Sequence, residues 1–204
     1  VKRYTVPVLE KWADVASEHK MYTESAAAYR RLYSVVEQPQ ARQKAAKHYV
    51  DMTILDAEDE LTLAMADDVE TMTDIEQSAL RKARFSKGKV LAKRGKTDEA
   101  MEIFRALSDN KDDVVGAESA YLVIAHHFDK GEHEQAEKLV YELADSKTSH
   151  SYFLGRAFIL LGDIYAAKGD TFQARATYQS IVDGYTPVDD GVVEDAKMKI
   201  QKLM

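Results

Sequence analysis

The chain has 204 residues, of which 45% are apolar and 31% are charged. This composition excludes a disordered chain, and the length is sufficient for a substantial core. The net charge of −7 argues against binding to nucleic acid, which requires a surplus of Lys and Arg. No apolar run approaches the roughly 20 residues that span a bilayer, so we expect no direct insertion into a membrane. Cysteine is absent, which excludes disulfides and thiolate metal sites.

Residue types that favour helices dominate the chain. It holds only three prolines and nine glycines, while Ala, Leu, Glu, Lys, Met and Gln abound. Too few turn-forming residues remain for many short strands, so the composition predicts an all-α protein. The first residue is Val1, where a natural chain normally begins with Met. We therefore expect a processed protein or a fragment of a longer one.

The helical pattern repeats along the chain, and each unit is predicted to form two helices joined by a short turn. In chain order, the five units cover residues 5–39, 41–75, 79–113, 116–150 and 155–188, and a closing helix covers 192–203. A small residue is expected where the second helix of each unit crosses the first. We assign this position to Ser25, Leu61, Ala100, Ala136 and Ala174, at spacings of 36, 39, 36 and 38 residues. The second unit fits the pattern least well and needs extra residues in its turn.

Glycine marks the turn inside the later units. Gly95, Gly131 and Gly169 are predicted to end the first helix of the last three units in the left-handed conformation. Pro7 is placed in the first turn of a helix, where its missing N–H leaves no helical hydrogen bond unmade. No proline is therefore expected to interrupt a helix.

The fifth unit shows the repeated pattern most clearly. Its marked positions are Phe158, Leu161, Gly162, Tyr165, Ala174, Tyr178 and Pro187. This order resembles the tetratricopeptide repeat, with Phe158 in place of Trp and Tyr178 in place of Phe. The resemblance implies a single all-α domain, a right-handed α-solenoid of about five helix-turn-helix repeats plus a C-terminal helix. It also implies a scaffold for protein–protein interaction rather than an enzyme, with no cofactor.

The resemblance further suggests which side chains face a concave groove that receives a peptide or a partner's helix. These residues are Asp14, Lys47, Lys82, Phe85, Lys89, His126, Arg156, Ile159 and Asp163. The mixture of Lys82, Lys89 and Arg156 with Phe85 favours an acidic, partly apolar segment of a partner protein. The alternative is an ordinary solvated helix face. The single asparagine, Asn110, lies in a predicted loop, so the asparagine-based carboxylate clamp of chaperone-binding members is not expected.

Two further hypotheses concern assembly and location. The ends of a solenoid can expose apolar helix faces. Self-association through these ends is therefore a second hypothesis for the function of the chain. The Lys-Gly-Asp turn at residues 168–170 and the aromatic hairpins resemble bacterial repeat proteins, including those that assemble complexes in the cell envelope. On this basis the periplasm or cell envelope is favoured over the cytoplasm.

Two groups of residues suggest a metal site, and each also has a simpler interpretation. A metal-dependent hydrolase would use His126, His127 and His133 with Glu132 or Glu134, but the spacing lacks the i, i+4 geometry of a zinc-binding helix. Ordinary surface or groove histidines are favoured. The acidic stretch 56–60 with 67–68 suggests calcium, yet it lacks the spacing and central Gly of a calcium loop. A solvated turn and helix start is favoured there.

Overall fold

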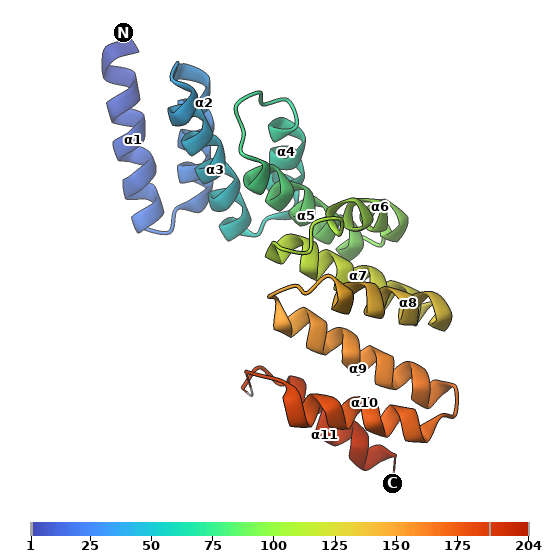
Figure 1. Ribbon diagram of the computed structural model, residues 1–204. Helices are drawn as coiled ribbons and strands as arrows, with labels where there is room; N and C mark the ends of the chain where they lie inside the picture. Colours follow the sequence, from blue (N-terminus) through green and yellow to red (C-terminus); the bar gives the residue numbers. More distant parts are fainter. Residues whose placement is uncertain (1, 188, 204) are drawn as a thin grey trace. The chain divides into compact units, whose positions relative to one another are not determined.

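The computed structural model describes residues 2–187 and 189–203, with side chains from Thr5 onward. Every regular element in this part is an α-helix, and there are eleven of them (Figure 1). They form five consecutive helix pairs and a closing helix, which confirms the predicted all-α repeat architecture. The last residue of the predicted fifth repeat, residue 188, lies outside the described residues. None of the described helices is long and apolar enough to cross a membrane.

The chain divides into two compact units, residues 1–103 and 104–204, with the boundary inside helix α6. The single-domain organisation therefore stays a prediction, and each unit is described separately. The first unit contains α1 (Lys2–Glu18), α2 (Tyr22–Val35), α3 (Pro39–Asp56), α4 (Asp59–Val69), α5 (Gln77–Lys93) and the start of α6 (Thr97–Leu107). In this unit α2 packs against both α1 and α3, and α5 packs against both α3 and α4.

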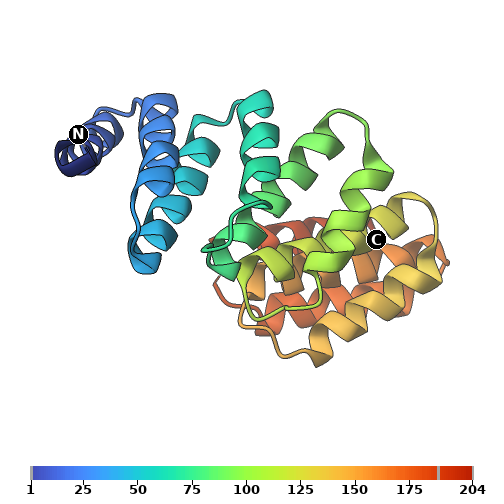
Figure 2. The same cartoon turned by 90° about the horizontal axis from the view of Figure 1, so that it is seen from above.

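The second unit repeats this arrangement with more regular helix pairs. It contains the end of α6 and then α7 (Val114–Asp129), α8 (His133–Asp145), α9 (Ser151–Ala167), α10 (Thr171–Gly184) and α11 (Val192–Lys202). Within it α9 packs against α7, α8, α10 and α11, so it is the central helix (Figures 1 and 2). The core of this unit forms two clusters, one with Ile124, Val140 and Leu161 and the other with Tyr178 and Ile181. The partly buried Phe158 and Tyr165 pack against both clusters.

The glycine turns form as the sequence predicts. Gly95, Gly131 and Gly169 have φ angles of 76°, 72° and 79°, in the left-handed region where glycine carries no steric penalty. In the first two repeats this position is taken by Lys20, with φ 60°, and Ala57, with φ 57°. The sequence pattern missed both turns because no glycine marks them.

The turn at Lys20 has the same hydrogen bond as the glycine turns. The Met21 N–H donates to the Ala16 carbonyl at 2.8 Å, and the Lys96 N–H donates to the Leu91 carbonyl at 2.9 Å. Both bonds reach back five residues, which is the arrangement that closes a helix with a left-handed residue. The backbone geometry of the repeat is thus kept although Lys20 has a side chain.

The small position of the second repeat is Thr62 rather than Leu61. Thr62 is 5% exposed, whereas Leu61 is only partly buried. Thr62 follows the left-handed Ala57 by five residues, and Ser25 follows Lys20 by the same interval. The assignment of Leu61 was therefore wrong, because it placed the extra residues in the turn when the turn has the usual length.

Pro7 lies inside a helix rather than in its first turn. α1 begins at Lys2, so Pro7 is its sixth residue. The placement of Pro7 in a first turn is therefore wrong, and Pro7 cannot donate the backbone hydrogen bond of its position. The helix nevertheless continues through Pro7 to Glu18.

Helices α9 and α10 approach each other closely at Gly162. A Cβ atom placed on Gly162 would lie 2.2 Å from the ring of Tyr178, which is 2% exposed and cannot move outward. The Tyr178 hydroxyl also donates a hydrogen bond to Asp163 at 2.6 Å, which fixes the ring from its far end. Glycine is therefore required at this crossing of α9 and α10.

Replacing Gly162 tests this requirement. Gly162→Ala should lower the free energy of unfolding by up to about 2 kcal/mol, because overpacking costs about 1–3 kcal/mol and the helix-propensity gain of about 1 kcal/mol offsets part of that cost. Chemical denaturation measures the change. Gly184→Ala is the matched control, since nothing lies within 4 Å of a Cβ at that position. It should be neutral or slightly stabilising, and an equal loss in both variants would contradict the close-contact explanation.

Candidate partner-binding site

Three residues of the predicted groove lie on one face of α5 in the first unit. Lys82, Phe85 and Lys89 are three and four residues apart, so they occupy successive turns of the helix. Phe85 is 8% exposed, and the Lys89 Nζ lies 5.4 Å from the centre of its ring, within range of a cation–π interaction. The Lys82 Nζ donates to the Asp51 Oδ1 of α3 at 2.8 Å. Lys82 therefore already stabilises the packing of α5 on α3.

A hollow of about 470 Å³ opens beside Phe85 and Lys89. Its lining comes from the end of α3, the start of α4 and one face of α5: Ile54, Ala57, Asp59, Thr62, Phe85, Ser86, Lys89, Val90 and Lys93. The apolar part can receive an uncharged side chain. The charged part holds Lys89 and Lys93 against one carboxylate, Asp59, whose Oδ1 lies 2.9 Å from the Lys93 Nζ. The lining therefore has an excess of positive charge, opposite to that of the whole chain.

The predicted groove residues of α9 contact the chain's own closing helix. The Arg156 Nη1 lies 2.8 Å from the Asp195 Oδ2, and the Lys199 Nζ donates to both Asp163 oxygens at 2.7 and 2.8 Å. Between these two ion pairs, Ile159 is 2% exposed and packs in the cluster that contains Val192 of α11. The surface on which α11 packs thus includes Arg156, Ile159 and Asp163. Ile159 lies in the core rather than on the surface.

Asp14 has the same structural role in the first repeat as Asp163 in the fifth. The Tyr29 hydroxyl donates to Asp14 at 2.9 Å, and the Tyr178 hydroxyl donates to Asp163 at 2.6 Å. In both repeats the tyrosine follows the aspartate by fifteen residues and joins the second helix to the first. Burial, followed by the hydrogen bond to Asp14, raises the pKa of Tyr29 to about 12. The two aspartates are predicted from the sequence to face the groove, and no sequence pattern indicated these tyrosine pairs.

The other two predicted groove residues do not line the hollow beside Phe85. Lys47 is exposed on α3, and His126 is partly buried on α7 in the second unit. Burial, together with nearby positive charge, lowers the pKa of His126, so the ring is neutral near pH 7. The structure therefore brings together Phe85 and Lys89 at one hollow. A continuous groove that joins them to His126 stays a prediction, because these residues belong to different units.

The histidines of the hydrolase hypothesis have other contacts. His127 pairs through Nδ1 with Glu132, and the His133 ring stacks on Phe128 with 5.6 Å between centroids. The His126 and His127 rings lie 5.9 Å apart in an edge-to-face arrangement. Among the described side chains, no group of three His, Asp or Glu residues is placed to hold a metal ion.

The acidic stretch after α3 faces basic residues rather than an ion site. Carboxylates of α4 and its end pair with side chains of α5 at 2.5 to 2.9 Å. The pairs are Asp59–Lys93, Glu60–Arg94, Asp67–Lys87 and Glu70–Arg84. Asp68 accepts two hydrogen bonds from Arg30 of α2, both at 2.9 Å. The acidic residues predicted to be simply solvated thus join the second repeat to both of its neighbours.

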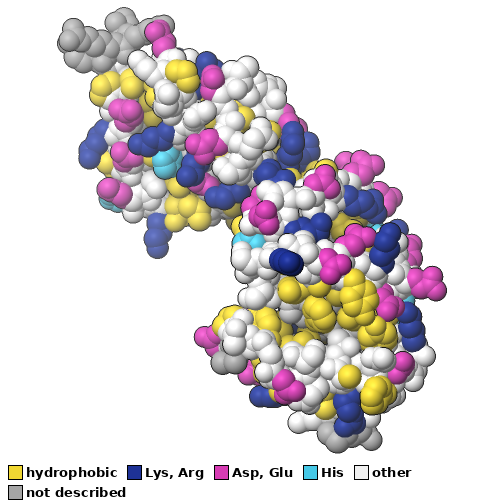
Figure 3. All heavy atoms as spheres, viewed as in Figure 1, with side chains coloured by type: hydrophobic (Ala, Val, Ile, Leu, Met, Phe, Trp, Pro, Cys, Tyr) yellow, Lys and Arg dark blue, Asp and Glu magenta, His cyan; other side chains and the backbone are white. Residues whose placement is uncertain are grey.

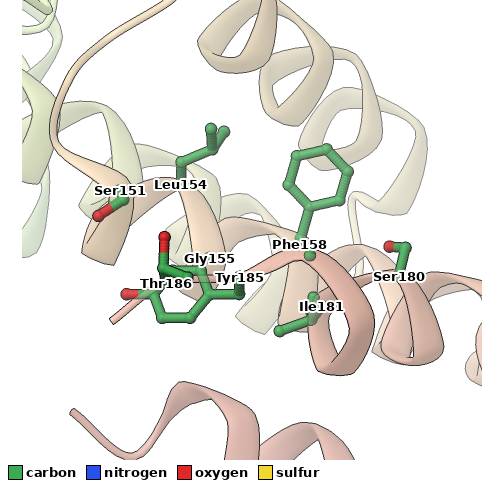
Figure 4. A pocket seen from close by; sticks show the side chains of 9 residues that line it. Ser151, Leu154, Gly155, Phe158, Ser180, Ile181, Tyr185 and Thr186 are labelled. Atoms are coloured by element: carbon green, nitrogen blue, oxygen red, sulfur yellow. The ribbon is translucent and has the colours of Figure 1, made fainter. Parts of the chain in front are cut away.

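A second hollow, of about 380 Å³, lies between α9 and α10 in the second unit (Figure 4). Ser151, Leu154 and Phe158 line it from one face of α9, and Ile181 and Tyr185 line it from the end of α10. Its lining has no Lys, Arg, Asp or Glu, in contrast to the hollow in the first unit. On the face seen in Figure 3, hydrophobic side chains gather on the second unit near α8 and α9, with acidic and basic side chains around them.

Comparisons with known proteins place the chain among helical repeats. A family model described as a tetratricopeptide repeat-like domain matches residues 16–204. The crystal structure of the C-terminal part of a TPR repeat-containing protein from Cytophaga hutchinsonii is similar with a TM-score of 0.60 and 13% identity, over 95% of this chain and 78% of that one. The structure of BtubC (BKLC) from P. vanneervenii is similar with a TM-score of 0.52 and 14% identity, over 88% of this chain and 81% of that one. No curated protein sequence matches.

A charge exchange between α4 and α5 tests the ion-pair interface. Arg84 binds Glu70 through two nearly parallel bonds, Nε–Oε1 at 2.6 Å and Nη2–Oε2 at 2.7 Å. Glu70→Arg or Arg84→Glu alone should each lower the free energy of unfolding by up to about 1 kcal/mol, because both side chains are partly exposed. The double exchange should recover most of that loss. Chemical denaturation of the four proteins gives the coupling.

The same pair has a defined dependence on pH. The hydrogen bond from Arg84 lowers the pKa of Glu70 below its ordinary value. A carboxylate with a lowered folded pKa stabilises the fold above its unfolded pKa, and this contribution is lost as the pH falls through the folded value. The coupling should therefore be present at neutral pH and vanish in strong acid. A coupling that is unchanged by acid would contradict the ion pair.

Proposed function

Because the chain belongs to the tetratricopeptide repeat-like family, we propose that it is a protein-interaction scaffold whose first unit binds a short partner segment. The observation that carries this proposal is the meeting of Phe85 and Lys89 at one hollow. Members of this family serve generally as repeat scaffolds for protein interaction. We propose binding rather than catalysis as the activity of the chain.

The chemistry of the hollow defines the segment that suits it. Ile54, Phe85 and Val90 provide an apolar surface of the kind that holds an anchor side chain in a peptide complex. Lys89 and Lys93 lie beside it and favour a carboxylate on the neighbouring residue of the partner. The expected ligand is an acidic segment that contains one leucine- or phenylalanine-sized side chain.

The contacts of the other predicted residues favour the hollow on α5, rather than α9, as the place where a partner binds. Reversing Arg156 would break its ion pair with Asp195 and disturb the packing of α11, whether or not a partner binds there. Lys82 has a comparable structural role through Asp51. Lys89 is the one predicted cation that lines the hollow, and one of its contacts is with the ring of Phe85.

Two variants test separately how the charge and the open volume of the hollow affect peptide affinity. Lys89→Glu should weaken the binding of labelled peptides that place Leu or Phe next to Asp or Glu, by at least about tenfold, since it replaces attraction with repulsion. Ser86→Trp should weaken the same peptides by filling the hollow, without any change of charge. Fluorescence anisotropy measures both affinities on a library of such peptides.

Lys197→Glu is the matched control. It makes the same charge change at an exposed position of α11, in the other unit, and should leave the affinity unchanged. Peptides with Lys in place of Asp and Glu should not bind the unmodified protein. Equal weakening by Lys89→Glu and Lys197→Glu would show a general charge effect, and retained binding in Ser86→Trp would place the ligand elsewhere.

A further inference from the structure

The outward face of α1 carries a group of exposed apolar side chains. Pro7, Val8, Lys11, Trp12 and Val15 line a shallow hollow there, and nearly all of its surface is apolar. Val8 is 65% exposed and Trp12 is 46% exposed. Lys11 is the one charged residue of this group. Such a face marks an interaction surface, because large apolar side chains rarely cluster in water without a partner.

The intramolecular contacts of α1 lie on another face. Ala13 and Ala16 are completely buried, and Ala13 packs in the cluster with Tyr29 and Leu32 of α2. At 100° per residue, Ala13 points away from Val8 and Val15, and Ala16 lies about a quarter-turn from them. The packing on α2 therefore leaves the outward face uncovered among the described residues.

We propose that this face pairs with the same face of a second copy of the chain, with the two α1 helices parallel. Val8 and Val15 are seven residues apart, the spacing that aligns one stripe along two paired helices. Lys11 and Trp12 lie on opposite sides of this stripe, since consecutive helical residues are 100° apart. A two-fold axis parallel to the helices places Val8 against Val8, Val15 against Val15, and each Lys11 beside Trp12 of the other copy.

Electrostatics selects the parallel orientation. In the parallel pair, both Lys11 side chains face an indole ring, where an ammonium group is attracted to the aromatic face. In an antiparallel pair, the two-fold axis crosses the helices and brings the two Lys11 side chains to the same side. The face thus contains its own complement only when the helices are parallel, which is the property of an isologous interface.

The pairing is expected to be weak and independent of the hollow on α5. One face of a 17-residue helix buries less than the roughly 1,200 Å² of a stable interface, so dimers should form only at high micromolar concentration. Because Val8 is exposed and the chain lacks cysteine, variants at this face can be made without disturbing the core.

Trp12 reports on the proposed pairing directly, since it is the only tryptophan in the chain. Sedimentation velocity and Trp emission, followed from low micromolar to near-millimolar concentration, should show a dimer and a shift of the emission to shorter wavelength together. Val8→Glu should weaken association at least tenfold and abolish the shift. Met198→Glu is the control, because Met198 is 54% exposed on α11 and should not affect either signal.

Cysteine cross-linking tests the orientation. Val8→Cys and Val15→Cys should each form disulfide-linked dimers on their own under mild oxidation, because like residues face each other in the parallel pair. Cross-links that form only in a mixture of the two variants would overturn the parallel pairing. A monomer at all concentrations would overturn the proposal, whether the emission wavelength shows an exposed or a buried Trp12 ring. A ring that is already buried in the monomer would show that another part of the chain covers the face.

Discussion

The paired helices of each repeat can approach closely only where the second helix carries a small side chain, and the rest of the structure depends on this. Ser25, Ala100, Ala136 and Ala174 are completely buried at these crossings, and Thr62 is nearly so. At the first crossing the Ser25 hydroxyl donates to the Ala13 carbonyl of α1 at 2.9 Å, so the two helices nearly touch through their backbones. A close crossing brings the larger side chains on either side into contact, as in the clusters around Tyr29 and Leu32 and around Tyr178 and Ile181. It therefore sets the angle at which each helix presents its outer face.

The turns that the sequence predicts are those in which glycine occupies the left-handed position. Gly95, Gly131 and Gly169 are recognisable because a left-handed turn strongly prefers glycine, and their spacing from the small residue is constant. Lys20 and Ala57 adopt the same conformation under the constraint of the surrounding helices, so nothing in their identity indicates it. The error at Leu61 follows from the missing marker, because without the turn the register of the second repeat could slip by one residue.

The candidate site could be predicted only in part. The position of a residue within the repeat does not show whether its side chain lines a hollow or contacts a neighbouring helix of the same chain. Lys82 and Arg156 occupy corresponding places on α5 and α9, and both form ion pairs with neighbouring helices. Ile159 has the same place on α9 as Phe85 has on α5, yet α11 covers it completely. Which of these positions faces a hollow depends on residues about 30 to 40 positions away in the chain, and no local pattern contains that information.

The ion pairs of the first unit also decide what can drive binding there. Lys93 already has Asp59 as a partner, so a carboxylate that arrives at the hollow replaces an existing pair rather than neutralising an isolated charge. Such an exchange between partly exposed groups changes the free energy little. The apolar surface beside Phe85 has no equivalent compensation, and its burial contributes about 25 cal/mol for each Å² removed from water. Affinity at this hollow should therefore come from the apolar side chain of the partner, while Lys89 and Lys93 select among partners by charge.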